Sequence, residues 1–73
     1  MKLYAKIQDR ESFHCERVVL CQFKDSNNDE VFVEEVEHYN LTCFKVLVDE
    51  GYVKTEYYYP VNNFSITELA IYE

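Results

Sequence analysis

Hydrophobic and polar residues alternate through the first segment of the chain. Over residues 2–8, Leu3, Ala5 and Ile7 fall on one side of an extended backbone, and the positions between them fall on the other. This period of two is the pattern of a strand with one buried face. The polar run Asp9–Ser12 follows directly. We therefore predict a strand over 2–8 and a turn after it.

The next segment, residues 13–24, is apolar on both faces. Its odd positions form a face that only Arg17 interrupts, and Val18 and Leu20 add apolar side chains on the opposite face. Strands that are covered on both faces have this pattern, so we predict one long, central strand over 13–24. The apolar residues at odd positions are Phe13, Cys15, Val19, Cys21 and Phe23.

A turn is predicted at residues 25–29, and the segment after it fits two structures. At helical spacing, four apolar side chains fall within an arc of about 120°, which favours a helix at 29–39 capped by Asn27 or Asn28. Three β-branched Val, and a turn that can close a hairpin onto the preceding strand, favour a strand instead. We favour the strand, with the helix as the alternative. The four side chains are Phe32, Val33, Val36 and Tyr39.

The rest of the chain predicts three further strands. Residues 41–48 and 52–59 flank Gly51, which suits the positive φ of a hairpin turn. Pro60 ends the second of these strands because it cannot donate to a ladder. Residues 63–73 alternate as a strand does, although Ser65 and Glu68 also match a helix-capping pattern.

The predicted fold class is therefore mainly β. We expect an antiparallel sheet of about five to six strands that can curl into a small barrel. An α+β fold that carries a helix at 29–39 is the alternative. A chain of 73 residues is long enough for one compact domain, so we predict a single domain over 1–73.

Size and cysteine content bear on where the protein acts. The chain has no apolar run of the length of a signal peptide or a spanning helix, and we expect it in the cytoplasm, or in the host cytoplasm if a phage encodes it. Its three cysteines are an odd number, which fits buried thiols in a reducing compartment. We expect no metal, because Cys15 and Cys21 would lie about 20 Å apart on one strand.

We also expect no enzyme and no cofactor. A single Gly in the chain leaves no glycine-rich loop to cradle a phosphate. The neighbours His14 and Cys15 would point to opposite faces of a strand, where they cannot form a nucleophile–base pair. A chain this short also has little room for a substrate pocket beside a core. Composition therefore favours a binding function.

Charge indicates the kind of partner. The net charge is −7, and residues 1–24 hold five basic and three acidic side chains, whereas residues 25–73 hold two basic and eleven acidic ones. Nucleic-acid binding depends on Lys and Arg, so we expect a larger protein with a basic surface as the partner, and no direct nucleic-acid or membrane binding. The candidate acids lie where Lys45 is the only cation, and they are Asp29, Glu30, Glu34, Glu35, Glu37, Asp49 and Glu50. The alternative is that these acids only keep the protein soluble.

Three consecutive tyrosines complete the candidate site. On a strand, Tyr57 and Tyr59 share one face and Tyr58 takes the other, so at least one ring is available to a partner. Tyr is a favoured anchor in protein interfaces. The alternative is that these residues are strand formers that pack against cross-strand neighbours.

These features lead to the hypothesis of a small inhibitor or adaptor that docks on a basic protein surface. In size, charge and lack of catalytic motifs, the chain resembles the short acidic proteins with which phages and mobile elements block host restriction or CRISPR machinery, some of which mimic nucleic acid. The resemblance covers no sequence motif. The alternative is a barrel-like interaction module, or a small subunit of a stable complex, that uses an aromatic groove or a sheet edge. A homodimer that pairs through exposed sheet edges is also compatible with the sequence.

Overall fold

The structure is a computed structural model that describes the backbone of residues 2–72, and the side chains of these residues except Glu68 and Tyr72. All regular structure in this range is β, so the prediction of a mainly β fold is confirmed, and a helix at 29–39 is wrong. The strands are β1 (Lys2–Asp9), β2 (Cys15–Cys21), β3 (Phe23–Lys24), β4 (Glu30–Val31), β5 (Val33–His38), β6 (Leu41–Asp49), β7 (Lys54–Pro60) and β8 (Phe64–Tyr72). Among the described residues, no helix is long and apolar enough to cross a membrane.

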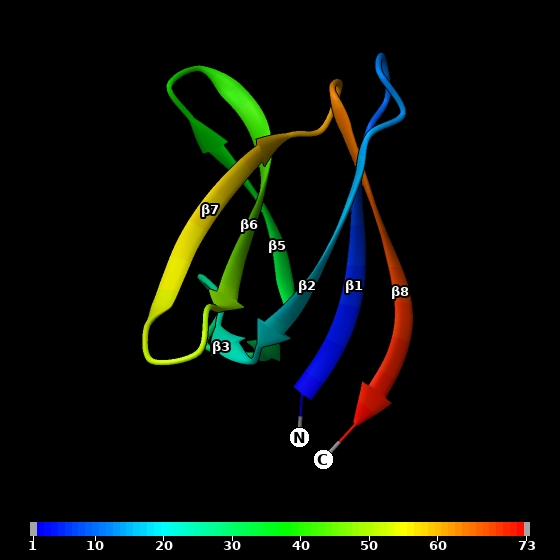
Figure 1. Cartoon of the computed structure of the whole chain (residues 1–73). Coiled ribbons are helices and arrows are strands. Elements are labelled where there is room, and N and C mark those ends of the chain that lie inside the picture. The colour runs from blue at the N-terminus through cyan, green and yellow to red at the C-terminus, as the bar shows by residue number, and fades with distance from the viewer. Residues whose placement is uncertain (1, 73) are drawn as a thin grey trace.

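Six of the strands form one antiparallel sheet in the order β5-β6-β2-β1-β8, with β7 also paired to β6. One edge of β6 pairs with β7, and the other edge pairs with β5 along residues 41–46 and then with β2 at residues 47–48. The sheet therefore divides at β6 into a β5–β6–β7 half and a β2–β1–β8 half. Figure 1 shows the two halves meeting where the end of β2 reaches β6 and leaning apart toward the other end of the molecule.

This sheet is open rather than a closed barrel over residues 2–72. No ladder in that range joins β8 to β5 or β7, so β5, β7 and β8 each keep an unpaired edge. Strands β3 and β4 form a separate two-stranded sheet, in which Phe23 pairs with Val31 and Lys24 with Glu30. The predicted turn at 25–29 closes this hairpin, since the Asp25 N–H donates to the Asp29 carbonyl at 2.9 Å.

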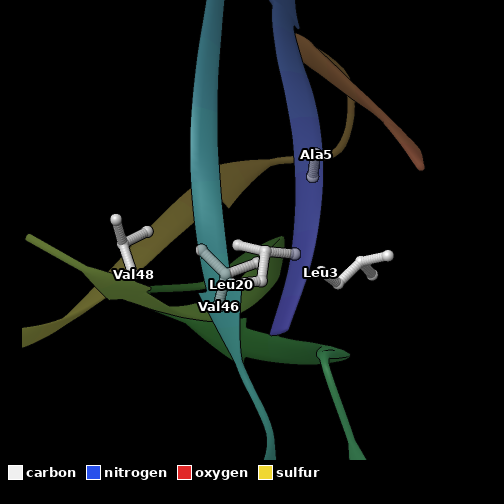
Figure 2. Close-up of a cluster of buried hydrophobic side chains, with 5 residues drawn as sticks. All are labelled: Leu3, Ala5, Leu20, Val46 and Val48. Carbon is white, nitrogen blue, oxygen red and sulfur yellow. The ribbon is translucent and has the colours of Figure 1, made fainter. Parts of the chain in front are cut away.

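The core lies where the two halves face each other. Leu3 and Ala5 come from β1 and Leu20 from β2, and they meet Val46 and Val48 of β6 (Figure 2). Each of these five side chains is 5% exposed or less. Full burial of a Val or Leu side chain contributes about 1.5–3 kcal/mol, so this cluster fixes the position of one half against the other.

The prediction of one strand over 13–24 is wrong in its extent. Phe13 has φ 61° and is 71% exposed, so it precedes the strand. At the other end, Cys21 is the last residue that pairs with β6, and the chain leaves the main sheet at Gln22 to form β3. The central position is confirmed, because β2 lies between β1 and β6.

Residues with positive φ lie in four of the hairpin turns, and two of these turns connect the strands β5, β6 and β7. Gly51 has φ 103° between β6 and β7, as its place in the sequence predicts. The turn between β5 and β6 has only two residues, Tyr39 and Asn40, with φ 50° and 65°. Positive φ at both positions is the type I′ geometry that matches the twist of a hairpin. Asn accepts this conformation readily, whereas a bulky aromatic residue adopts it at a cost.

Candidate partner-binding surface

A row of acidic and aromatic residues crosses the β5–β6–β7 half. The register places Glu35 of β5 opposite Phe44 of β6, and Phe44 opposite Tyr59 of β7. Residues directly opposite one another in a sheet project to the same side, so these three side chains share a face. Glu37 lies two positions after Glu35 and projects to that face as well. Both glutamates are exposed, and within residues 2–72 neither forms an ion pair.

Two tyrosines of β7 continue this face. The rings of Tyr57 and Tyr59 lie 6.0 Å apart, and Tyr59 makes an edge contact with Phe64 of β8 at 5.2 Å. The Tyr57 hydroxyl donates to Glu50 at 2.8 Å, and the Thr55 hydroxyl donates to the same carboxylate. These bonds hold the Tyr57 ring in place at the end of the β6–β7 hairpin while leaving 36% of it exposed.

The charge of a further carboxylate, that of Glu16, acts on both tyrosines. The hydrogen bond to Glu50 raises the pKa of Tyr57, and burial followed by the charge of Glu16 raises the pKa of Tyr59. Hydrogen bonds from Thr55 and Tyr57 lower the pKa of Glu50, since they stabilise its charged form. Glu16 belongs to β2 and lies opposite Ile7, whose side chain is buried between the halves.

We call this surface the acid–tyrosine face. It comprises Glu16, Glu35, Glu37, Phe44, Tyr57 and Tyr59. It combines exposed and half-buried rings with carboxylates that no cation of residues 2–72 neutralises by an ion pair. Aromatic rings attract cations through their faces, and carboxylates add direct charge attraction. The arrangement is therefore suited to Lys and Arg side chains of another protein.

Other predicted site residues lie on the opposite surface of the same half. Tyr58 stacks on His38 with ring centroids 3.9 Å apart, away from Tyr57 and Tyr59. The Glu34 carboxylate accepts a hydrogen bond from the Ser26 N–H at 2.9 Å. Tyr58 and Glu34 thus make contacts within the chain. The site residues predicted from the sequence therefore do not form one continuous surface.

The remaining predicted acids are spread over two hairpins. Glu30 lies 3.8 Å from Lys24, and Asp49 pairs with Lys2. That contact with Lys2, together with a hydrogen bond from the Gly51 N–H, lowers the pKa of Asp49. Asp29 is exposed in the turn between β3 and β4. These three acids contribute to the overall charge but are separate from the acid–tyrosine face.

The structure also brings in residues that the sequence analysis did not single out. Phe44 joins the acid–tyrosine face through its pairings with Glu35 and Tyr59 in two adjacent hairpins. Glu16 acts on the tyrosines from β2, a strand far from them in the sequence, which no local pattern reveals. Tyr39 is 88% exposed at the tip of the β5–β6 hairpin. The sequence contains a pattern that could have indicated this exposure, since Tyr39 directly precedes Asn40, a residue typical of turns.

Cysteine positions agree only in part with the expectation of buried thiols. Cys21 and Cys43 are buried, whereas Cys15 is exposed at the start of β2. The Cys15 thiol contacts the Phe13 carbonyl at 3.6 Å. Cys15 lies opposite Gln8 on the surface that faces away from the core, which explains its exposure.

Comparison of the chain with protein-family models, with curated proteins and with solved structures found no match.

Proposed function

We propose that this protein binds a larger protein through its acid–tyrosine face and acts as a small inhibitor or adaptor. The observation that carries the proposal is the row of Glu35, Phe44 and Tyr59 across three strands. A basic side chain that docks there gains both a carboxylate and an aromatic surface. The preferred partner is a protein with a Lys- and Arg-rich surface.

The narrower form of the proposal is mimicry of nucleic acid. Carboxylates two residues apart on a strand, such as those of Glu35 and Glu37, are spaced by about 6.5 Å, which is similar to the spacing of phosphates along a strand. A groove built to hold nucleic acid would accept such charges, and charge attraction would speed the encounter at low salt. A phage-type blocker of a host restriction or CRISPR complex would act in this way.

A titration with an Arg- and Lys-rich peptide tests the binding chemistry. The chain has seven Tyr and no Trp, so tyrosine emission can be followed without a Trp signal, and two of the emitting rings, Tyr57 and Tyr59, belong to this face. We expect saturable quenching by the peptide. The double variant Glu35→Gln/Glu37→Gln should bind roughly tenfold more weakly at low salt, because two charges that face the ligand are lost. The matched control is Glu11→Gln/Asp29→Asn, which removes two exposed charges outside the face and should bind as the wild type does.

Capture from lysate of the source cell or its host tests the partner class. Proteins bound to wild type, to the Glu35→Gln/Glu37→Gln variant and to the control variant are compared by mass spectrometry after washes at low and high salt. The proposal expects a nucleic-acid-handling protein that is lost at high salt and is absent with the Glu35→Gln/Glu37→Gln variant. Equal capture by all three proteins would contradict it.

The second candidate function is an interaction module that uses a sheet edge. It rests on the unpaired edges of β5, β7 and β8 within residues 2–72. A partner strand added to such an edge binds mainly through backbone hydrogen bonds. Its affinity would barely change with ionic strength, whereas binding to exposed carboxylates weakens as the Debye length falls from about 10 Å at 0.1 M to about 3 Å at 1 M salt. A captured partner that survives high salt would favour this function.

A further inference from the structure

The outer surface of the β2–β1–β8 half carries two cations directly opposite each other. Lys6 of β1 pairs with Arg17 of β2 across the antiparallel ladder. Both side chains project away from the core, because Ala5 and Ile7 on either side of Lys6 are buried. Like charges directly opposite in a sheet destabilise it. The pair therefore has no explanation in the stability of the fold.

No described neighbour on this surface neutralises the pair. Among the side chains that the structure describes, which do not include Glu68 and Tyr72, none forms an ion pair with Lys6 or Arg17. The register places only uncharged residues beside the pair on the same face, and these are Tyr4, Gln8, Cys15, Val19, Ser65, Thr67 and Ala70. In a chain of net charge −7, this is a local excess of positive charge.

A bulge in β8 opens a hollow next to the same pair. Ala70 pairs with Tyr4 and Glu68 pairs with Ala5, so Leu69 is an extra residue without a partner on β1. Leu69 is 45% exposed, and with Tyr4, Arg17 and Ala70 it lines an open hollow of about 420 Å³. Bulges often redirect a side chain beside a binding site.

We propose that this hollow and the adjacent Lys6–Arg17 pair bind an extended acidic peptide segment of a partner protein. Carboxylates of the segment lie against Arg17 and Lys6, where a guanidinium can hold a carboxylate with two hydrogen bonds. An apolar side chain between those carboxylates packs on Leu69 and Ala70. The site lies on the outer surface of the β2–β1–β8 half, whereas the acid–tyrosine face lies on the β5–β6–β7 half together with Glu16 from the core-facing side of β2. The two sites select ligands of opposite charge, so the protein can bridge two partners.

The test uses the peptide acetyl-Glu-Asp-Leu-Asp-Glu-amide and two-dimensional NMR of the whole chain. We expect saturable shift changes at Leu69, Arg17 and Lys6. A peptide with Ser in place of Leu should bind more weakly, and a peptide with Gln and Asn in place of the acids should not bind. Absence of shifts at these three residues, or equal binding of the uncharged peptide, would overturn the proposal.

Protein variants separate this site from general charge effects. Arg17→Gln and Lys6→Gln should each weaken the peptide roughly tenfold, which corresponds to the loss of one charge-assisted contact. Lys54→Gln makes the same change in net charge at the β6–β7 hairpin and should bind as the wild type does. The amide spectrum of each variant shows whether it is folded. Equal weakening in Lys54→Gln would overturn the proposed site.

Two more outcomes identify the occupant. The Glu35→Gln/Glu37→Gln variant should bind the acidic peptide like wild type, so failure of the acid–tyrosine face and failure of this site can be told apart. Sedimentation of the wild type at increasing concentration should show no self-association. If the wild type does associate and Arg17→Gln abolishes that association, the occupant is the acidic β5 strand of a second copy, and the proposal of a partner peptide is overturned.

Discussion

Tyr57 links the stability of the β6–β7 hairpin to pH. Its pKa is raised above the unfolded value of about 10 by the hydrogen bond to Glu50. The contribution of this bond to stability is therefore complete below pH 10 or so and is lost as the pH rises through the raised pKa. Tyr59 acts in the same direction because of its burial.

We accordingly predict that Tyr57→Phe flattens the decline in stability at alkaline pH. The variant loses the bond at neutral pH, so its free energy of unfolding should be lower than that of wild type near pH 8 and should approach the wild-type value as the pH rises through the raised pKa of Tyr57. Urea denaturation followed by circular dichroism across this range measures the difference. Tyr52→Phe is the matched control, because that ring is 96% exposed, and it should follow the wild-type curve. Parallel curves for Tyr57→Phe and wild type would contradict the assignment.

For the Lys6–Arg17 pair, we predict a substitution that raises stability rather than lowering it. Lys6→Glu replaces a like-charge pair by an attractive one, and cross-strand pairs of this kind contribute about 0.2–1 kcal/mol. The variant should therefore be more stable than wild type in urea denaturation while it no longer binds the acidic peptide. Lys54→Glu makes the same change in charge opposite Asp49, where it creates a like-charge pair and should lower stability. Loss of stability in Lys6→Glu would mean that the cation is required by the fold.

At the level of elements, the β5–β6 hairpin carries backbone strain at its tip. Tyr39 has φ 50° and is 88% exposed, so packing does not offset the cost of this conformation. Asn is among the preferred residues at this position of a type I′ turn. Asn or Gly at position 39 would suit the stability of the turn better than Tyr. Tyr39 instead provides an exposed ring beside His38.

Tyr39→Asn should therefore stabilise the protein by about 1 kcal/mol. Thermal and urea denaturation measure the gain, and Tyr52→Asn, at another exposed tyrosine with no strained φ, should give none. If the ring contacts a partner, the same variant should reduce capture of that partner from lysate while binding of the basic peptide is unchanged. A destabilised Tyr39→Asn would show that the aromatic ring supports the turn.

Local patterns were sufficient to predict most strands, because each depends on a short-range alternation. The alternation of Leu3, Ala5 and Ile7 and the turn at Gly51 are examples, and the structure follows both. The choice of strand over helix at 30–39 rested on β-branched Val residues, and it is correct. The extent is wrong, because the segment divides into β4, which pairs with β3, and β5, which pairs with β6, and Tyr39 lies in the turn after β5. The break at Gln22 could not be predicted, because it depends on where β2 stops pairing with β6, which is a tertiary contact.

The candidate site was predictable only where sequence neighbours share a face. Alternation correctly placed Tyr57 and Tyr59 together and Tyr58 apart. It could not show that Asp49 meets Lys2 at the far end of the chain. Nor could it show that Glu16 approaches the tyrosines. The high density of acidic residues along the sequence therefore led to the prediction of a more continuous acidic surface than the structure has.

For the whole molecule, the excess of acidic residues lies in the β5–β6–β7 half of the sheet. The strands β5, β6 and β7 hold five acidic and two basic residues, whereas β1, β2 and β8 hold three of each. The Lys2–Asp49 pair links the two halves. The cations Lys6 and Arg17 and the acids of β5 lie on different halves and can face two partners of opposite charge.

Salt dependence of stability tests whether the acid–tyrosine face is under electrostatic strain. Glu35 and Glu37 lie two apart on one strand, at about 6.5 Å, and Glu16 approaches the same tyrosines. Added salt screens their repulsion, so the wild-type melting temperature should rise between about 0.02 and 0.3 M NaCl. The Glu35→Gln/Glu37→Gln variant should start higher and rise less, whereas Glu11→Gln/Asp29→Asn, with the same net charge, should keep most of the wild-type rise. A basic partner would relieve the same repulsion, so the strain measured by salt is free energy that binding can recover. Equal curves for the two variants would show instead that net charge alone sets the response, and the acids would then serve solubility.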